Sequence, residues 1–189
     1  MSICVAPERP CLNSMDFDRE TCTMNITQKI SPCLWFDHQA EEAVRFYVSV
    51  FEDSRVIGMT HYGTAGFDIH GRPAGSVMSV LFELAGQAFT ALNGGPVFTF
   101  NEAISLQIQC RDQAEIDRYW SALGEGGDPD AQVCGWLKDR YGVSWQVLPT
   151  LLTEMIGQGD QEAANRVMTA MLQMKKLEVT ALQKAFEGR

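Results

Sequence analysis

The side chains best suited to metal or acid–base chemistry are scattered along this sequence. The three histidines, His38, His61 and His70, fall at a predicted helix start, at a strand end and in a glycine-rich loop. Residues in such places are usually exposed, so we expect solvated roles for all three. Glu83 stands at a strand end, and Asp139 begins a turn in which an aspartate bonds its own backbone. The sequence therefore offers no general base with a supporting partner.

The six cysteines do not form a metal-binding or disulfide pattern. No two of them are spaced as Cys-x-x-Cys, the arrangement of most thiolate zinc sites. Three lie in the first 25 residues, and the others are far apart: Cys33, Cys110 and Cys134. We expect reduced thiols, those in strands behaving as small core residues.

The elements that must position any site follow a repeated order. Residues 29–37 predict a strand that ends at Asp37, a good helix N-cap, and residues 39–51 place apolar side chains at helical spacing. Three strands follow, the last two joined by a turn at Ala85 and Gly86. Their ranges are 54–62, 76–84 and 87–93. The order is β-α-β-β-β.

The order begins again, and the same strand followed by a helix falls at an offset of 73 residues. Residues 102–110 predict a strand, and Asp112 with Glu115 forms a capping box that opens a helix over 112–123. Two short strands are predicted at 133–139 and 143–149. We interpret the chain as a duplicated βαβββ unit.

Both ends of the chain differ from this pattern. Residues 1–25 lack the apolar region of a signal peptide and predict a disordered extension, within which Met24 is an alternative start. The segment 150–189 predicts helices, with Asp160 as a cap. One helical face there is rich in methionine, and we expect it to serve core or subunit packing. Its members are Met168, Met171, Leu172 and Met174.

The composition predicts one soluble, cytoplasmic domain. The chain has 189 residues, 46% hydrophobic and 21% charged, and a net charge of −9. That charge argues against nucleic acid and anionic membranes as partners, because both require a basic surface. No uncharged apolar run reaches the roughly 18 residues of a membrane span.

Several segments are similar to the glyoxalase/bleomycin-resistance (vicinal-oxygen-chelate) superfamily, in particular to its PhnB-like branch labelled 3-demethylubiquinone-9 3-methyltransferase. They are ISPCLWFDHQAEEAVRFYVSVFEDSRV, FTALNGG, FNEAISLQIQC, CGWLKDRYGVSWQVLP and VMTAMLQMKKLEV. The resemblance implies an α+β fold in which two βαβββ modules form a cupped mixed sheet that holds the ligand. It implies modules at 26–97 and 98–149 within a domain at 26–189, helices at 150–189, and a homodimer.

The resemblance also locates the superfamily's metal-ligand positions. They fall on Pro32, Phe89, Ser105 and Gln146. Proline and phenylalanine have no ligand atom, and hydroxyl and amide oxygens are poor ligands for the transition metals that imidazole and carboxylate hold. We therefore expect neither a metal nor another cofactor.

Strand alternation then predicts which side chains line the cup. Taking Pro32 as inward places Leu34 and Phe36 there too, and puts Trp35 under the helix. The same parity turns Ala91, Gln109 and Ser144 inward. Trp145 is expected in the core, and Trp136 at the mouth of the cup. The predicted ligand-binding residues are Phe36, Phe89, Asn93, Ser105, Gln107, Trp136 and Gln146.

Three functions remain open at this point. The leading hypothesis is a metal-free homodimer that binds a small, partly apolar molecule in the cup. The alternatives are a metal-dependent isomerase, lyase or dioxygenase, and an interaction protein in which Gln107 and Gln146 only bond each other. Methyl transfer from S-adenosylmethionine is not favoured, because neither Gly94-Gly95 nor 124–127 runs from a strand through Gly-x-Gly into a helix.

Overall fold

A computed structural model describes residues 28–157 and 159–189, and it has the predicted duplicated order. The extension expected at 1–25 and the alternative start at Met24 lie outside the described residues. The first module contains β1 (Cys33–Phe36), α1 (Ala40–Val50), β2 (Arg55–His61), α2 (Phe67–His70), β3 (Val77–Leu84) and β4 (Gln87–Asn93). The second contains β5 (Leu106–Cys110), α3 (Gln113–Gly124), β6 (Asp128–Val133), β7 (Trp136–Lys138) and β8 (Ser144–Pro149), of which β6 was not among the two strands predicted after the helix.

Each module forms its own four-stranded mixed sheet. The strand orders are β1-β4-β3-β2 and β5-β8-β7-β6, and in each sheet the first and last strands of the module pair in parallel. The α+β class and the paired βαβββ modules are thus confirmed. The turn at Ala85 and Gly86 is also confirmed, since both residues adopt the positive φ that a tight hairpin requires.

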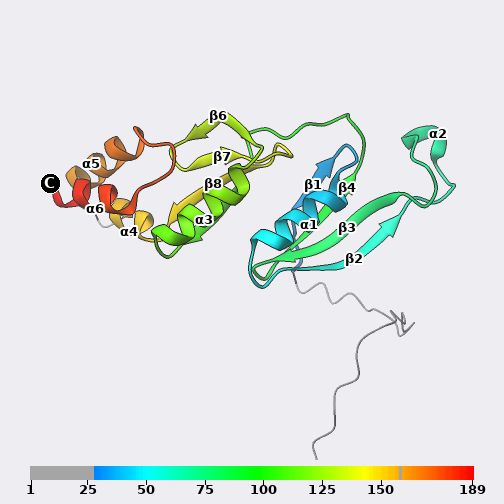
Figure 1. The fold of residues 1–189 in the computed structure, drawn as a ribbon, viewed down its shortest axis with the longest axis horizontal. Coiled ribbons are helices and arrows are strands. Elements are labelled where there is room, and N and C mark those ends of the chain that lie inside the picture. Colours follow the sequence, from blue (N-terminus) through cyan, green and yellow to red (C-terminus); the bar gives the residue numbers. More distant parts are fainter. Residues whose placement is uncertain (1–27, 158) are drawn as a thin grey trace, which may run out of the picture.

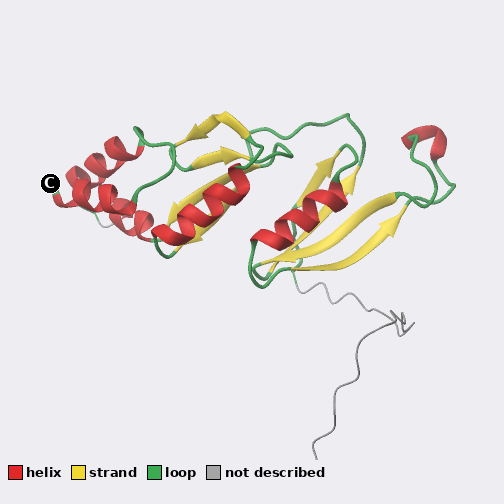
Figure 2. Cartoon of the chain, viewed as in Figure 1, coloured by secondary structure: helices red, strands yellow, loops and turns green. Residues whose placement is uncertain are grey.

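One face of each sheet is covered by a helix. Figures 1 and 2 show α1 against the first sheet and α3 against the second, both on the same side of the molecule. We call the opposite side of each sheet its open face. Apolar side chains that alternate along the strands pack beneath the helices into one core shared by both modules. Its members include Leu34, Phe36, Val80, Phe82, Ala91, Ile108, Leu137 and Val147.

The helix starts follow the predicted chemistry only in part. Asp112 caps α3 by accepting a hydrogen bond from the Glu115 amide at 2.9 Å, and Asp160 caps α5. The prediction that Asp37 caps α1 was wrong, because the helix begins at Ala40 and makes no side-chain cap bond from its flanking residue. Asp37 instead pairs with Arg72 at 2.7 Å.

The carboxylate of Asp139 joins the two modules. Its Oδ2 accepts hydrogen bonds from the Tyr47 hydroxyl of α1 and from the Trp145 indole of β8, both at 2.8 Å. Its Oδ1 accepts from the backbone amides of Tyr141 at 2.8 Å and Val143 at 3.0 Å. Burial raises the pKa of Asp139, and these four donors oppose that rise. The predicted turn role is confirmed, and the contact with the other module is added to it.

Aromatic side chains surround this junction. The Phe51 ring stacks on Tyr119 of α3 with centroids 5.0 Å apart, and on Trp145 at 5.4 Å. Phe36 meets Phe100 of the inter-module linker edge-on at 5.2 Å. Such offset and edge-on pairs are favourable beyond the area they bury. The modules are therefore held together by a buried polar centre inside an aromatic shell.

The C-terminal helices α4 (Leu151–Gly157), α5 (Gln161–Met171) and α6 (Val179–Glu187) form a second, smaller core. They attach to the second module through the turn before β7, where the amides of Cys134 and Gly135 donate to the carbonyls of Met174 and Lys175, each at 2.8 Å. The methionine-rich face is divided: Met171 and Met174 pack on this core, whereas Leu172 remains 57% exposed.

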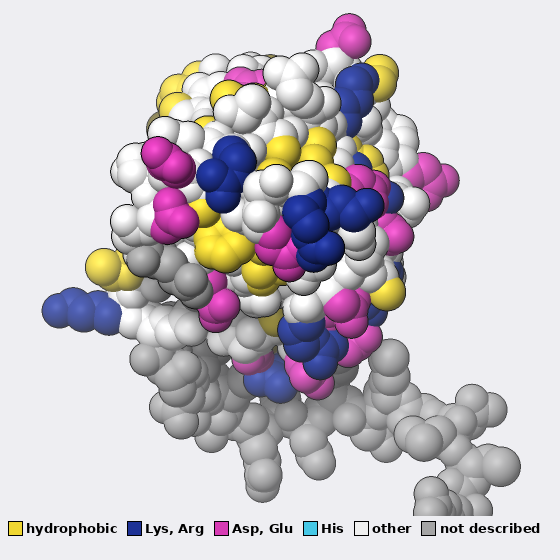
Figure 3. Space-filling view, turned by 90° about the vertical axis from the view of Figure 1, so that its left-hand side faces the viewer, with side chains coloured by type: hydrophobic (Ala, Val, Ile, Leu, Met, Phe, Trp, Pro, Cys, Tyr) yellow, Lys and Arg dark blue, Asp and Glu magenta, His cyan; other side chains and the backbone are white. Residues whose placement is uncertain are grey.

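The surface at this end of the molecule carries basic and acidic side chains intermixed, with scattered apolar ones between them (Figure 3). None of the helices in the described part of the chain is long and apolar enough to cross a membrane.

Replacing Asp139 by asparagine should lower the free energy of unfolding by about 3 kcal/mol, because the new amide group would face two donors in a buried site. Chemical denaturation measures the change. The control is Asp130→Asn, which removes the same charge from an exposed position and should cost less than about 0.5 kcal/mol. Equal effects of the two substitutions would show that Asp139 does not hold the modules together.

Candidate functional site

The predicted orientation of the first sheet was wrong. Phe36 and Phe89 are 3% and 5% exposed and lie in the helix-covered core, where Phe89 stacks on Phe82. Leu34 and Ala91 share that face. Both faces of β1 carry apolar side chains, so alternation sorts the residues into two sets without showing which set the helix covers. Trp35, expected under α1, is on the open side instead.

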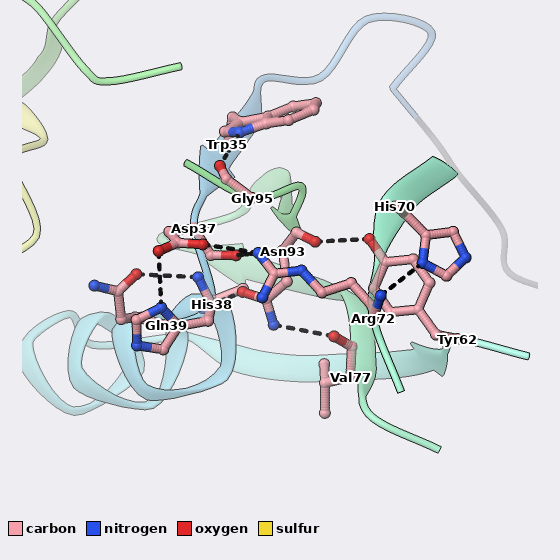
Figure 4. A network of polar contacts seen from close by, with 11 residues as sticks. Trp35, Asp37, His38, Gln39, Tyr62, His70, Arg72, Val77, Asn93 and Gly95 are labelled. Carbon is pink, nitrogen blue, oxygen red and sulfur yellow. Dashed lines mark hydrogen bonds and ion pairs between the residues drawn. The ribbon is translucent and has the colours of Figure 1, made fainter. Parts of the chain in front are cut away.

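Asn93, the third predicted ligand residue of this sheet, also points toward α1. Its Oδ1 accepts a hydrogen bond from the Ala40 amide at 2.8 Å, and its Nδ2 donates to the Val77 carbonyl at 3.0 Å (Figure 4). Its own carbonyl accepts from the Tyr62 hydroxyl at 2.7 Å. The side chain thus satisfies the first turn of α1, which is the role predicted for Asp37.

Trp35 ties the first module to the start of the linker 94–105. Its Nε1 donates to the Gly95 carbonyl at 2.8 Å (Figure 4), and its ring meets Phe98 edge-on at 5.0 Å. A β-carbon on Gly94 would overlap the indole ring, so only glycine permits this approach. Position 127 also requires glycine, since a β-carbon there would overlap the Lys138 carbonyl oxygen. Both glycines have packing roles.

The second sheet has the predicted orientation and brings four of the predicted residues together on its open face. The Gln146 Nε2 donates to the Ser105 hydroxyl at 2.7 Å, and the Gln107 Nε2 donates to the Gln146 Oε1 at 3.3 Å. Trp136 lies directly opposite Gln146 in the strand pairing. Trp145 occupies the core, as predicted. The expected bond between the two glutamines exists, but Gln107 remains exposed.

A cavity of about 480 Å³ lies over β7 beside these residues. Glu102, Ala131, Val133, Cys134, Trp136, Leu137, Lys138 and Ser144 line it. A second cavity, of about 340 Å³, lies between β1, the linker and the start of β8, and Ser144 lines that one too. The sheet has therefore not collapsed around the bonded glutamines.

Ser144 is the unusual residue of this face. It is 3% exposed, and its hydroxyl is the one buried side-chain oxygen or nitrogen in residues 28–157 and 159–189 without a hydrogen-bond partner. Leaving such a group unpaired costs about 1–3 kcal/mol, and native proteins rarely tolerate it. A ligand that offers an acceptor in either cavity would recover that energy.

Lys138 lies directly opposite Ser144 in the strand pairing and forms an ion pair with Glu102 of the linker. Hydrogen bonding to Lys138 lowers the pKa of Glu102. Sequence reasoning missed both residues. Lys138 could have been found, since it is two residues from Trp136 in the same strand and therefore shares its face. Glu102 could not have been found from the sequence, because it lies in a loop, where side chains do not alternate between two faces.

The four positions that the resemblance identifies with metal ligands do not fit a divalent ion. Pro32 and Phe89 offer no side-chain donor, and Phe89 faces the core. Ser105 and Gln146 bond each other. Within the part of the chain that the structure describes, no three His, Cys, Asp or Glu side chains gather where they could hold a metal.

The three histidines lie away from these positions. His38 is exposed and lies 3.2 Å from the Asp37 carboxylate, and His61 is exposed at the end of β2. His70 packs on Tyr62, with ring centroids 4.5 Å apart.

Comparison with known proteins now gives the family. The family model for 3-demethylubiquinone-9 3-methyltransferase matches residues 28–148, and the chain belongs to that family. The PhnB protein of Bacillus cereus is 35% identical, with a TM-score of 0.55 over 65% of this chain and 99% of that one. The resemblance to the PhnB-like branch is thus confirmed. The family match ends before α4, so the C-terminal helices lie outside it.

Two further solved structures are similar over most of their length. Protein PA1353 from Pseudomonas aeruginosa is 24% identical with a TM-score of 0.49, covering 65% of this chain and 97% of that one. A protein from Staphylococcus aureus is 33% identical with a TM-score of 0.28, covering 64% and 94%. No curated protein sequence matches the chain.

Replacing Ser144 by alanine should leave the free energy of unfolding unchanged or raise it by up to about 1 kcal/mol, because the substitution removes an unpaired buried hydroxyl. The matched control is Ser105→Ala on the same face, which loses the bond to Gln146 and should cost about 1 kcal/mol. Denaturation of both variants checks the pair. A clear loss of stability in Ser144→Ala would mean that its hydroxyl has a partner in the free protein.

Proposed function

We propose that the chain binds a small, partly apolar molecule on the open face of the second sheet, without a metal ion. The observation that carries this proposal is the unpaired hydroxyl of Ser144 between two cavities. Apolar walls with a few converging polar groups are typical of small-molecule sites. In this proposal the ligand contacts Ser105, Trp136, Lys138 and Ser144, which line the two cavities. Gln146 and Gln107 support the site through the hydrogen bond from Gln146 to Ser105 and the one from Gln107 to Gln146.

The residues of the first sheet support this site from a distance. Phe36 and Phe89 form the core beneath α1, and Asn93 fixes the start of that helix. In the proposal they hold β1 and the linker in place, and the ligand does not touch them. Methyl transfer is not part of the proposal, because Gly94 and Gly127 are explained by packing and neither leads from a strand into a helix.

A homodimer belongs to the same proposal. The linker beside the two cavities exposes Val97, Phe98 and Ile104, which are 72%, 62% and 68% accessible. Apolar side chains grouped in this way are typical of protein interfaces. A second copy packed on the linker would close the 340 Å³ cavity, which is open beside Phe98 and Ile104. Nucleic acid is not an expected partner, given the net charge of −9.

Native mass spectrometry of gently purified protein should show a dimer that carries an organic molecule and no stoichiometric metal. The retained mass identifies the compound with which turnover is then tested. The control is the same sample under denaturing conditions, which separates a bound molecule from a covalent modification. One metal ion per subunit would contradict the proposal. So would a protein that carries no bound molecule even after the mildest purification.

The linker contact can be tested separately. Ile104→Asp should convert the dimer to a monomer, because the new carboxylate would be buried without a partner in the interface. The matched control is Ile69→Asp, since Ile69 is 92% exposed on α2 at the far end of the first module. Light scattering after size-exclusion chromatography measures both. A dimer that survives Ile104→Asp, or that is lost equally in Ile69→Asp, would show that the linker is not the interface.

A further inference from the structure

The 480 Å³ cavity over β7 is lined by one ion pair, between Lys138 and Glu102. Among the described residues that line it, Lys138 is the only cation and Glu102 the only anion. Lys138 belongs to β7, in the middle of the second sheet's pairing, and its side chain is 22% exposed. Glu102 belongs to the irregular linker, and its side chain is 58% exposed. Glu102 is therefore the more solvent-exposed partner, and its backbone lies outside the sheet that contains Lys138.

Ser144 offers a second hydrogen-bond donor to the same cavity, next to the Lys138 ammonium. It lies opposite Lys138 in the strand pairing, which places the two side chains next to each other on the open face. Its hydroxyl has no partner in the described part of the chain, although it is almost fully buried. On the other side of Lys138 the paired residue is Asp128, whose Oδ1 already accepts a hydrogen bond from the Asp130 amide at 2.9 Å. Glu102 is the carboxylate that forms the ion pair with Lys138.

The other residues that line the cavity are mostly apolar and would contact the apolar part of a ligand. Val133, Leu137 and Ala131 are apolar, and Trp136 contributes an indole ring beside the ion pair. An ammonium and a neighbouring hydroxyl can together donate to one carboxylate, which needs charge-assisted hydrogen bonds to leave water. The space already accommodates a carboxylate, since that of Glu102 stands at its edge.

We propose that Lys138 and Ser144 bind the carboxylate of a small acid with an apolar or aromatic body, and that Glu102 is an internal carboxylate which holds this position until the ligand displaces it. This inference rests on the proposed binding function and names its ligand class. Glu102 then competes with the ligand for Lys138 and lowers the apparent affinity for it. When the ligand displaces Glu102, the linker loses its ion pair with the second sheet.

The experiment compares 3-phenylpropionate with its neutral analogue 3-phenylpropionamide on the full chain. Dissociation constants come from the shift of the indole N–H resonance of Trp136, which lines this cavity. We expect Lys138→Met to weaken binding of the carboxylate about tenfold and to change binding of the amide less than about twofold. Glu102→Gln should strengthen binding of the carboxylate by about threefold or more, because the competitor is neutralised.

Two surface substitutions control for net charge. Lys184→Met on α6 and Glu154→Gln on α4 make the same changes of charge at exposed positions outside the cavity lining, and neither should alter the difference between the two probes. Ser144→Ala should weaken the binding of 3-phenylpropionate more than the binding of 3-phenylpropionamide. Unchanged amide binding also shows that each variant is folded.

Failure of this inference is distinct from failure of the proposed function. If both probes bind equally to the wild-type chain, or if Glu102→Gln leaves carboxylate binding unchanged, the ligand class and the role of Glu102 are wrong while a binding cavity remains. If neither probe shifts the Trp136 resonance and native mass spectrometry retains no molecule, the binding function itself fails, and this inference fails with it.

Discussion

The carboxylate of Asp139 is a buried charge in a protein whose two sheets share no strand pairing. Four donors converge on it, and one of them, the Tyr47 hydroxyl, comes from the other module. A buried charge with fixed donors tolerates little displacement, because each lost bond leaves it less compensated for the water it has given up. This contact therefore sets the position of α1 relative to the turn between β7 and β8.

The candidate site depends indirectly on the position of this turn. The turn that contains Asp139 connects Lys138 at the end of β7 to Ser144 at the start of β8, so the polar centre and the two proposed donors belong to one hairpin. The linker reaches the site from the other module, held by Trp35 at its first residues and by the Lys138–Glu102 pair further along. The 480 Å³ cavity lies between the second module and the linker, and the 340 Å³ cavity lies where both modules and the linker meet.

The two sheets have different roles despite their common topology. In the first, the predicted ligand residues face the core beneath α1, and Asn93 accepts a hydrogen bond from the first turn of that helix. In the second, hydroxyl, amide, indole and ammonium groups share one open face. A duplicated unit allows this division, because one copy can maintain the packing while the other carries a site. The family has this fold in common, whereas binding depends on the side chains that this particular chain places on the open face of its second sheet.

Much of this fold could be read from the sequence. The periods of two and 3.6 residues located most strands and helices, the repeat at an offset of 73 residues indicated the duplication, and Asp112 and Asp160 marked helix starts. Alternation, with the parity taken from the family resemblance, also grouped Ser105, Gln107 and Gln146 on one face. These features are local, and their physical causes act over a few neighbouring residues.

The tertiary structure alone decided the rest. Alternation sorted β1 and β4 into two sets, but only the packing of α1 selected the set that contains Phe36, Phe89 and Asn93 for the core. The burial of Asp139, the unpaired hydroxyl of Ser144 and the approach of Glu102 to Lys138 depend on where separate segments meet. No local period encodes such meetings, because they arise from the path of the whole chain and from the solvent that it excludes.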